Sequence, residues 1–342
     1  MRASTLSSIN KANRSFMTLI RQLPSGGISM LAAVFLIGAV GSYYLFTTHA
    51  ATPTASVQTE SGTVTSPALT VGDTSASGSH AVKFAKAATS GTALHYAGNS
   101  NFGANGQYLP GAYGFNLADV GSVSDLTSLP AGVKGLAWVG QCNGADATFT
   151  NTVKPYIGHP KLFGFYLMDE PDATGQWAPK CPIANLKAES DWIHANVPGA
   201  KTFIISLNMA SSSNPSYAGT YNSTNSDIDL FGLDPYPCRT ELSGCDYTYI
   251  TKAVPAAVAA GINKSAIVPV YQTFGLGKWV DDGGSTYAVP TATQAQKIID
   301  TWASVVPNPV FDYAYSWGSQ NSDTALESMP AVQQVFLAHN TQ

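Results

Sequence analysis

The stretch Leu162-Phe-Gly-Phe-Tyr-Leu-Met-Asp-Glu-Pro171 places two adjacent carboxylates directly after a continuous apolar run. A run of this kind predicts a strand buried on both faces, as in parallel sheets. Because side chains alternate along a strand, we expect Glu170 on the side of Tyr166 and Asp169 on the other. Pro171 donates no backbone hydrogen bond, so the strand ends where the acids begin. The acids therefore lie at the carboxyl edge of the sheet, unless Asp169 merely caps a following helix.

Similar apolar runs recur from about residue 91 to the end of the chain, with helical or turn-rich segments between them. The expected strands are residues 92–96, 112–117, 133–139, 162–168, 202–207, 228–233, 267–272 and 311–317. Eight strands alternating with helices in about 250 residues predict a (β/α)8 barrel at residues 91–342. A doubly wound open sheet is the alternative, but no Gly-x-Gly-x-x-Gly follows an early strand.

The first 90 residues differ in composition from the barrel segment. Four basic residues precede an uncharged apolar segment at residues 28–46, which as a helix is long enough to cross a hydrocarbon core of about 30 Å. This pattern predicts a cytoplasmic tail at residues 1–27, a transmembrane signal anchor and an extracellular body. The alternative is a signal peptide cleaved after Ala50, which gives a secreted protein. Residues 47–90 are rich in Ser, Thr and Ala and are expected to form a linker with short strands.

Charge and cysteine content narrow the class of protein. The net charge of −4 and a pI near 5.8 argue against a nucleic-acid partner. The cysteines have no metal-ligand spacing, and we expect no metal or cofactor. In an exported protein they predict two disulfides, Cys142 with Cys181 and Cys238 with Cys245.

The predicted strand ends carry carboxylates, amides and large aromatic rings. Asp169, Glu170 and Asp234 are the catalytic candidates, whereas Asp119 is interpreted as the cap of a helix at residues 122–129. Aromatic faces stack on sugar rings, and carboxylates and amides bind sugar hydroxyls, so this composition favours a glycan. The expected substrate-binding residues are Asn116, Trp138, Asn208, Tyr236, Tyr271, Gln272, Tyr315 and Trp317.

These endings resemble the large clan of (β/α)8 glycoside hydrolases. In that clan an Asn-Glu or Asp-Glu pair, often followed by Pro, closes strand four, and a Trp usually ends strand eight. The resemblance implies that Glu170 is the general acid/base, with Trp317 at the strand-eight position. Residues 57–64 and 72–84 also resemble the opening strands of β-sandwich carbohydrate-binding modules, but the match is only a fragment.

One departure from the clan concerns the nucleophile, a Glu at the end of strand seven where this chain has Gln272. Asp234 is then the expected second carboxylate, at about 5–5.5 Å from Glu170 as a nucleophile or about 6.5–9.5 Å to hold a water. Alternatively Asp169 and Glu170 resemble the acid pair of hexosaminidases that use the substrate's own acetamido group. A non-catalytic glycan-binding protein, or an envelope scaffold that binds proteins, are the remaining alternatives. The leading hypothesis is an exported glycoside hydrolase acting on a polysaccharide or cell-wall glycan.

Overall fold

The computed structural model describes residues 68–72, 80–84, 94–281 and 284–342. The predicted tail, transmembrane segment, cleavage site after Ala50 and most of the linker lie outside these residues. Among the described residues, none forms a helix long and apolar enough to cross a bilayer. The chain divides into two compact units, Met1–Ala85 and Lys86–Gln342. In the first unit, β1 (Ala68–Gly72) and β2 (His80–Phe84) pair antiparallel.

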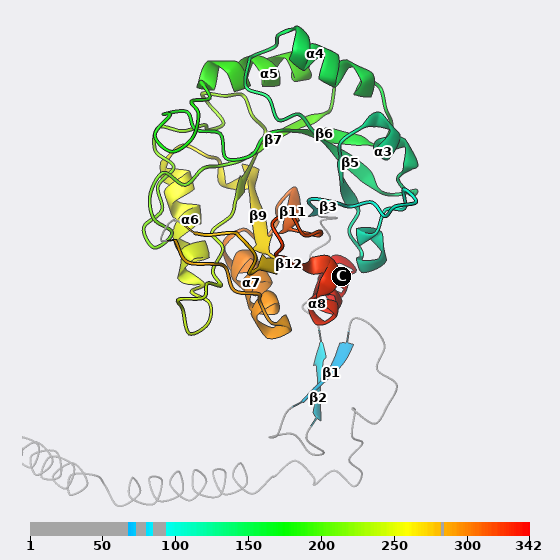
Figure 1. Ribbon diagram of the computed structural model, residues 1–342, viewed down its shortest axis with the longest axis vertical. Helices are drawn as coiled ribbons and strands as arrows, with labels where there is room; N and C mark the ends of the chain where they lie inside the picture. The colour runs from blue at the N-terminus through cyan, green and yellow to red at the C-terminus, as the bar shows by residue number, and fades with distance from the viewer. Residues whose placement is uncertain (1–67, 73–79, 85–93, 282–283) are drawn as a thin grey trace, which may run out of the picture. The chain divides into compact units, whose positions relative to one another are not determined.

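The second unit contains the predicted eight-stranded barrel (Figure 1). Its strands are all parallel and close in the order β11-β3-β4-β5-β6-β7-β8-β9, so the barrel has no open edge. The apolar run that ends in the two acids is β6, the fourth barrel strand. The strands are β3 (Leu94–Ala97), β4 (Leu117–Val120), β5 (Lys134–Trp138), β6 (Leu162–Met168), β7 (Lys201–Ile205), β8 (Leu230–Leu233), β9 (Ile267–Gln272) and β11 (Phe311–Tyr315).

Helices surround the barrel in the ring that Figure 1 shows. A capping box begins α7, in which the Thr291 side chain accepts from the Gln294 N–H and the Gln294 side chain accepts from the Thr291 N–H. A short antiparallel pair, β10 (Phe274–Gly275) and β12 (Thr324–Ala325), lies beyond the strand ends. The helices are α3 (Val123–Ser128), α4 (Ala147–Val153), α5 (Ile183–Asn196), α6 (Thr248–Ala259), α7 (Ala292–Val305) and α8 (Pro330–Asn340), with 3-10 turns η2 (Pro110–Tyr113), η3 (Lys154–Tyr156), η4 (Lys264–Ala266) and η5 (Leu326–Ser328).

The second strand begins later than expected. Residues 110–113 form η2 instead, because Pro110 fits a first helical turn and Gly114 reverses the chain at φ 79°. Asn116 therefore precedes β4 rather than ending it, and Asp119 lies near its carboxyl end. The cap of α3 is Ser122, whose side chain accepts a hydrogen bond from the Asp125 N–H, so the interpretation of Asp119 as that cap is wrong.

The inside of the barrel is filled mainly by large side chains. One buried cluster includes Tyr96, Tyr166, Phe203, Phe311 and Tyr313, which pack edge-to-face or tilted at centroid distances of 4.5–6.4 Å. These rings fill the interior of the barrel, and the Tyr166 hydroxyl donates to Asp169 beyond the end of β6. At Gly164 a side chain is excluded, because a Cβ there meets the Lys201 carbonyl oxygen at 2.1 Å.

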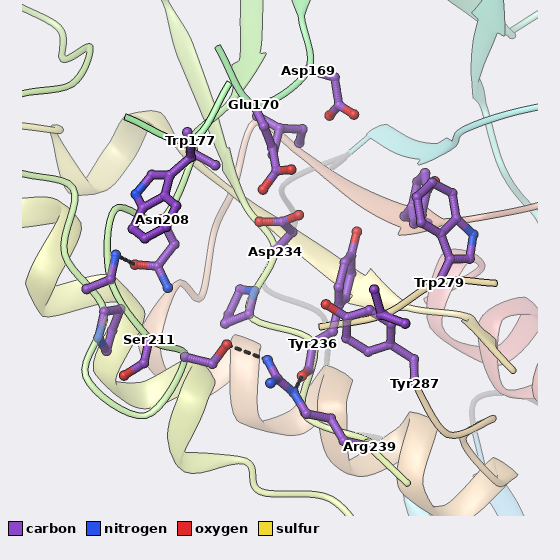
Figure 2. A pocket seen from close by; sticks show the side chains of 18 of the residues that line it. Asp169, Glu170, Trp177, Asn208, Ser211, Asp234, Tyr236, Arg239, Trp279 and Tyr287 are labelled. Carbon is purple, nitrogen blue, oxygen red and sulfur yellow. Dashed lines mark hydrogen bonds between the residues drawn. The ribbon is translucent and has the colours of Figure 1, made fainter. Parts of the chain in front are cut away.

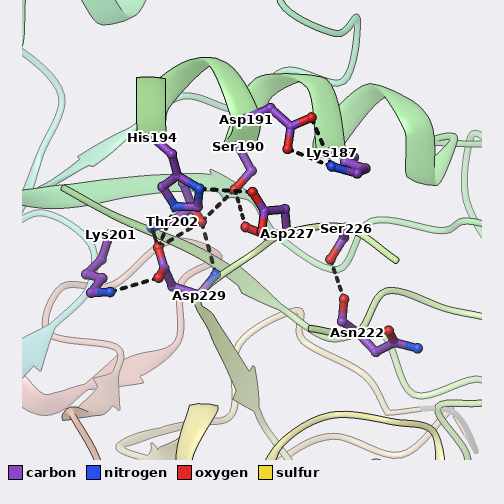
Figure 3. A network of polar contacts seen from close by, with 10 residues as sticks. All are labelled: Lys187, Ser190, Asp191, His194, Lys201, Thr202, Asn222, Ser226, Asp227 and Asp229. Atoms are coloured by element: carbon purple, nitrogen blue, oxygen red, sulfur yellow. Dashed lines mark hydrogen bonds and ion pairs between the residues drawn. The ribbon is translucent and has the colours of Figure 1, made fainter. Parts of the chain in front are cut away.

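A polar network joins α5 to the outer face of β7 and β8 (Figure 3). Asp229 accepts hydrogen bonds from the Lys201 ammonium at 2.8 Å and the Thr202 N–H at 2.9 Å, and it contacts His194 at 2.9 Å. Burial lowers the pKa of His194, but the Asp229 and Asp227 carboxylates outweigh it and raise that pKa overall. The helix is therefore held in register with the strands by charge as well as by apolar packing.

A second outer-face cluster joins β3, β11 and α8. Asp312 contacts Nδ1 of His95 at 2.9 Å and Nε2 of His339 at 2.8 Å, and its side chain is 4% exposed. Burial opposes ionisation of Asp312, but the two histidines hold its pKa below the usual range. Burial likewise opposes protonation of His339, and Asp312 raises its pKa overall. The ion pair therefore fastens the last helix to the barrel.

Asp312→Asn is expected to lower the free energy of unfolding by about 3 kcal/mol, because it removes the charge from a buried pair. The depressed pKa of Asp312 contributes stability above about pH 4, and the raised pKa of His339 contributes below about pH 6.5. Urea unfolding should therefore show the largest loss of unfolding free energy between about pH 4 and about pH 6.5. Lys187→Ala, which breaks an exposed pair with Asp191, should leave the midpoint unchanged. A loss independent of pH would contradict this account.

Candidate active site

The carboxyl end of β6 brings both acids to one cavity. A register irregularity between Tyr166 and Met168 interrupts the pairing with β7, and Glu170 adopts φ 42°. The strand alternation that predicted opposite sides therefore does not continue through the acids. Asp169 accepts a hydrogen bond from the Tyr166 hydroxyl at 2.6 Å and lines the same cavity as Glu170.

The first cavity has a volume of about 670 Å³ and opens at the mouth of the barrel. This volume is ordinary for a ligand-binding pocket. Its walls come from the loops after β6, β7, β8 and β9 and from the carboxyl ends of the strands β7 and β11. The lining residues are Asp169, Glu170, Trp177, Ile205, Leu207, Asn208, Ala210, Ser211, Ser212, Pro215, Tyr217, Asp234, Pro235, Tyr236, Arg239, Phe274, Trp279, Val280, Tyr287, Tyr313 and Tyr315.

Glu170 and Asp234 point toward one another across this cavity (Figure 2). Solvent reaches Asp169 and Glu170 through the mouth, while protein atoms surround them on the other sides. The surrounding protein atoms displace part of the water around the Glu170 carboxyl. This burial, together with repulsion from Asp169, raises the pKa of Glu170 to about 7. Burial, with repulsion from Glu170 and Asp169, raises the pKa of Asp234 well above its ordinary value. Because both ionised carboxylates repel each other, the pair keeps a proton into the neutral range.

Aromatic rings flank the carboxylates. Trp177 stands on one side of Glu170, and Trp279 and Tyr287 stand on the opposite side of the cavity (Figure 2). Tyr236 packs nearly parallel to Tyr315, with ring centroids 6.0 Å apart. A site that offers rings as walls and carboxyls at its centre matches the two faces of a sugar, apolar C–H and polar hydroxyl.

Arg239 holds the rim of the first cavity. Its guanidinium pairs with Asp281 at 2.7 Å, donates to the Ser212 hydroxyl, and lies over the rings of Tyr249 and Tyr287. Arg239 is buried. It therefore fixes the loops after β7, β8 and β9 relative to one another.

A second cavity of about 580 Å³ adjoins the first. Asp169, Trp279, Tyr313 and Tyr315 line both cavities, whereas Glu170 and Asp234 line only the first. The remaining walls of the second cavity are Tyr96, Asn99, Ser100, Asn101, Phe102, Asp119, Gly121, Asp125, Trp138, Tyr166 and Gln320.

The predicted site residues divide into two groups. Asp169, Glu170, Asp234, Asn208, Tyr236 and Tyr315 line the first cavity, and Trp138 lines the second. Asn116, Tyr271, Gln272 and Trp317 line neither cavity. The ends of the predicted strands located the first group. The sequence did not reveal five lining residues that lie in loops, because loops show no hydrophobic periodicity: Trp177, Tyr217, Arg239, Trp279 and Tyr287. An isolated Trp in a Gly-rich loop was one sequence signal that could have indicated a binding residue.

Gln272 has a role in holding the main chain. Its amide oxygen accepts from the Cys238 N–H at 2.8 Å, and its amide nitrogen donates to the carbonyls of Cys238, Phe274 and Ala288 at 2.9–3.2 Å. The side chain is 1% exposed. It joins the loops after β8 and β9. The prediction that Gln272 contacts substrate is therefore corrected: its side chain binds the main chain and lines neither cavity.

The other three outlying residues also have internal partners. Trp317 is 3% exposed and packs against Tyr113 and Phe115. Tyr271 lies on the outer face with its hydroxyl 3.4 Å from Asp312, and Asn116 accepts from the His95 N–H at 2.7 Å. These expected substrate contacts are corrected to packing and hydrogen bonding inside the protein.

Both predicted disulfides are formed. Cys142, after β5, bonds to Cys181, after β6, and Cys238 bonds to Cys245 within the loop after β8. Disulfides are typical of proteins that leave the reducing cytosol. Here they tie loops at the mouth of the barrel.

One group of potential metal ligands occurs among the described residues. His95, Asp312 and His339 place ligand atoms within 4.8 Å of one another. The group lies on the outer face of the barrel, and its members hydrogen-bond one another. It is therefore separate from the carboxylates of the first cavity.

Comparison with known proteins finds similarity in structure only. No family model matches the chain, and no curated protein matches it in sequence. Similar solved structures include a fungal endo-β-N-acetylglucosaminidase of glycosyl hydrolase family 18, at 15% identity and a TM-score of 0.44, covering 72% of this chain and 96% of that one. A chitinase from Bacteroides thetaiotaomicron has 11% identity and a TM-score of 0.47, with 73% and 98% covered. A chitinase-like agglutinin from Robinia pseudoacacia has 8% identity and a TM-score of 0.44, with 72% and 99% covered. At these identities the similarity concerns the fold alone.

Gln272→Glu is expected to lower the free energy of unfolding by about 3 kcal/mol, because an acceptor-only carboxylate then faces three main-chain carbonyls in a buried site. The change should add no hydrolytic activity. Thermal or urea unfolding measures the loss, and Gln334→Glu on the exposed side of α8 is the matched control. Unaltered stability together with a gain of activity would show that this side chain reaches the substrate.

Proposed function

We propose that the protein is an exported glycoside hydrolase that cleaves a polysaccharide or cell-wall glycan by carboxylate acid–base catalysis. The observation that supports this most directly is that Glu170 and Asp234 face each other in an aromatic-walled cavity. Glycosidic bond cleavage needs one carboxyl that holds a proton at working pH and a second that is ionised. Repulsion between Glu170 and Asp234 in a confined site favours one protonated and one ionised carboxyl.

In this proposal Glu170 is the general acid and donates its proton to the glycosidic oxygen as the bond to the anomeric carbon breaks. When Glu170 carries the shared proton, Asp234 is ionised, and it then stabilises the positive charge that develops on that carbon and activates the incoming water. The released sugar gains the hydroxyl of that water, and its remaining proton returns to the carboxylates. Asp169, held by the Tyr166 hydroxyl, keeps the pKa of Glu170 high.

Substrate-assisted hydrolysis is a variant of the same activity. Asp169 and Glu170 line the same cavity, so Asp169 can orient an acetamido group while Glu170 protonates the leaving oxygen. Gln272 favours this variant over attack from strand seven, since its amide is occupied by the main chain. The variant applies only to sugars that carry an N-acetyl group.

Export rests on two features of the chain. The apolar segment at residues 28–46 predicts an anchor or signal peptide. Both disulfides favour an oxidising compartment. An extracellular location agrees with a polysaccharide or cell-wall glycan as substrate.

A non-catalytic glycan-binding protein is the second candidate. The observation in its favour is that β9 ends in Gln272, so strand seven of the barrel offers no carboxylate to the cavity. Such a protein uses the same rings and polar groups to bind sugars but releases no product.

Glu170→Gln is expected to reduce the rate of glycan hydrolysis by about 10²–10⁴-fold, because the amide cannot donate an acidic proton. A reducing-sugar assay on soluble polysaccharides measures the rate, and Glu241→Gln on the exposed loop after β8 is the control. Retention of more than a tenth of the activity would remove the assignment of Glu170. Saturable glycan binding without product in the wild type, unchanged by Glu170→Gln, would identify the binding protein instead.

Asp169→Asn is expected to move the alkaline limb of the pH–rate profile to lower pH. The Asp169 carboxylate raises the pKa of both Glu170 and Asp234, so its removal lets the shared proton leave at lower pH. The wild-type limb is expected near pH 7. Rates measured from pH 4 to 9 test the shift, and a limb that stays in place or moves upward would contradict the electrostatic role of Asp169.

A further inference from the structure

We propose that the two cavities form one binding groove that holds sugar units on both sides of Glu170, so that the protein acts on internal bonds of a linear glycan. This inference rests on the proposed function and specifies its substrate. A site for terminal units needs a single closed pocket. Here the first and second cavities, of about 670 Å³ and 580 Å³, share Asp169, Trp279, Tyr313 and Tyr315 as a common boundary.

Glu170 and Asp234 line only the first cavity, close to that boundary residue Asp169. A chain whose scissile bond reaches Glu170 therefore has room for units in the first cavity and for further units in the second. Each volume lies within the range of ordinary ligand sites. The geometry thus places the reacting bond inside the bound length rather than at its end.

An exposed tryptophan lines each cavity. Trp177 lines only the first cavity and is 64% exposed, and Trp138 lines only the second and is 40% exposed. A ligand that covers such a ring removes apolar surface from water, which favours binding. The flat face of an indole is suited to a sugar ring, so each Trp offers a platform for one unit.

The main chain that carries Trp177 is held in place before any ligand arrives. The Asp172 carboxylate accepts hydrogen bonds from the N–H groups of Thr174, Gly175, Trp177 and Ala178 at 2.7–3.1 Å. Burial opposes ionisation of Asp172, but hydrogen bonds from the Thr174 hydroxyl and from the N–H groups of Trp177, Ala178 and Thr174 hold its pKa below the usual range. The loop then ends at Cys181, which is bonded to Cys142.

The Trp138 platform is fixed by different contacts. Its ring stands edge-to-face against Tyr166 with centroids 4.8 Å apart. It also lies so close to the main chain at Gly140 that a Cβ there would meet Nε1 at 2.7 Å. Because the main chain at Trp177 and the ring of Trp138 are held in this way, binding an extended chain has a lower ordering cost.

The test uses the full chain carrying Glu170→Gln, so that binding is measured without turnover. Calorimetry is performed with chitohexaose, cellohexaose, xylohexaose and maltohexaose, and with the disaccharide of whichever binds. The hexasaccharide is expected to bind at least tenfold more tightly than its disaccharide. Trp138→Ala and Trp177→Ala are each expected to weaken hexasaccharide binding about tenfold. Ile157→Ala, at an exposed apolar residue that lines neither cavity, should change nothing.

The possible outcomes distinguish a failure of the groove proposal from a failure of the hydrolase proposal. Dependence on both tryptophans without product from the wild type supports the groove and removes the hydrolase. Internal cleavage of an end-labelled hexasaccharide by the wild type supports both. Loss of binding in only one Trp variant, release of terminal units alone, or no binding of any of the four hexasaccharides overturns the groove.

Discussion

The backbone at Glu170 is the constraint on which the candidate site depends. A non-glycine residue at φ 42° costs about 1–3 kcal/mol relative to an extended residue. The closed barrel over-determines this conformation, because β6 is paired on both sides and Pro171 follows directly. The result is a third carboxylate, Asp169, in the cavity that already contains Glu170 and Asp234. Without that turn the alternation of the strand separates the two neighbours.

Three acids in one cavity with no lysine in its walls favour the sharing of a proton. The single arginine at the rim, Arg239, is paired with Asp281 and directed at the loops. The cations of the outer face, such as His194, Lys201 and His339, serve other carboxylates. Ion pairs on the outer face thus hold helices to the barrel. In the proposed catalytic cavity the carboxylates have no cationic partner in such a pair among the residues that the structure describes, and they repel one another. The Tyr166 hydroxyl inside the barrel donates a hydrogen bond to one of these acids, Asp169.

The barrel was predictable from sequence because parallel strands buried on both faces appear as apolar runs, and the run at residues 162–168 matches β6 residue for residue. The acids at its end were predictable for the same reason. The sequence could not predict which way side chains point at the ends of the strands. Gln272 has the same parity as the inward-facing Val268 and Val270, yet its amide is taken up by loop carbonyls that no local pattern reveals. The position of Trp177 depends on Asp172 and a disulfide, which are long-range or loop features.

Both covalent cross-links lie on the same side of the barrel, beyond the carboxyl ends of its strands, and neither ties one strand to another or to the base. The scaffold therefore owes its integrity to noncovalent packing, while the shape of its upper loops depends on the redox state of the surroundings. A reduced chain can have a complete barrel while the loops at its mouth lack their covalent ties. Oxidation of the four cysteines is then the step that fixes the shape of the candidate site.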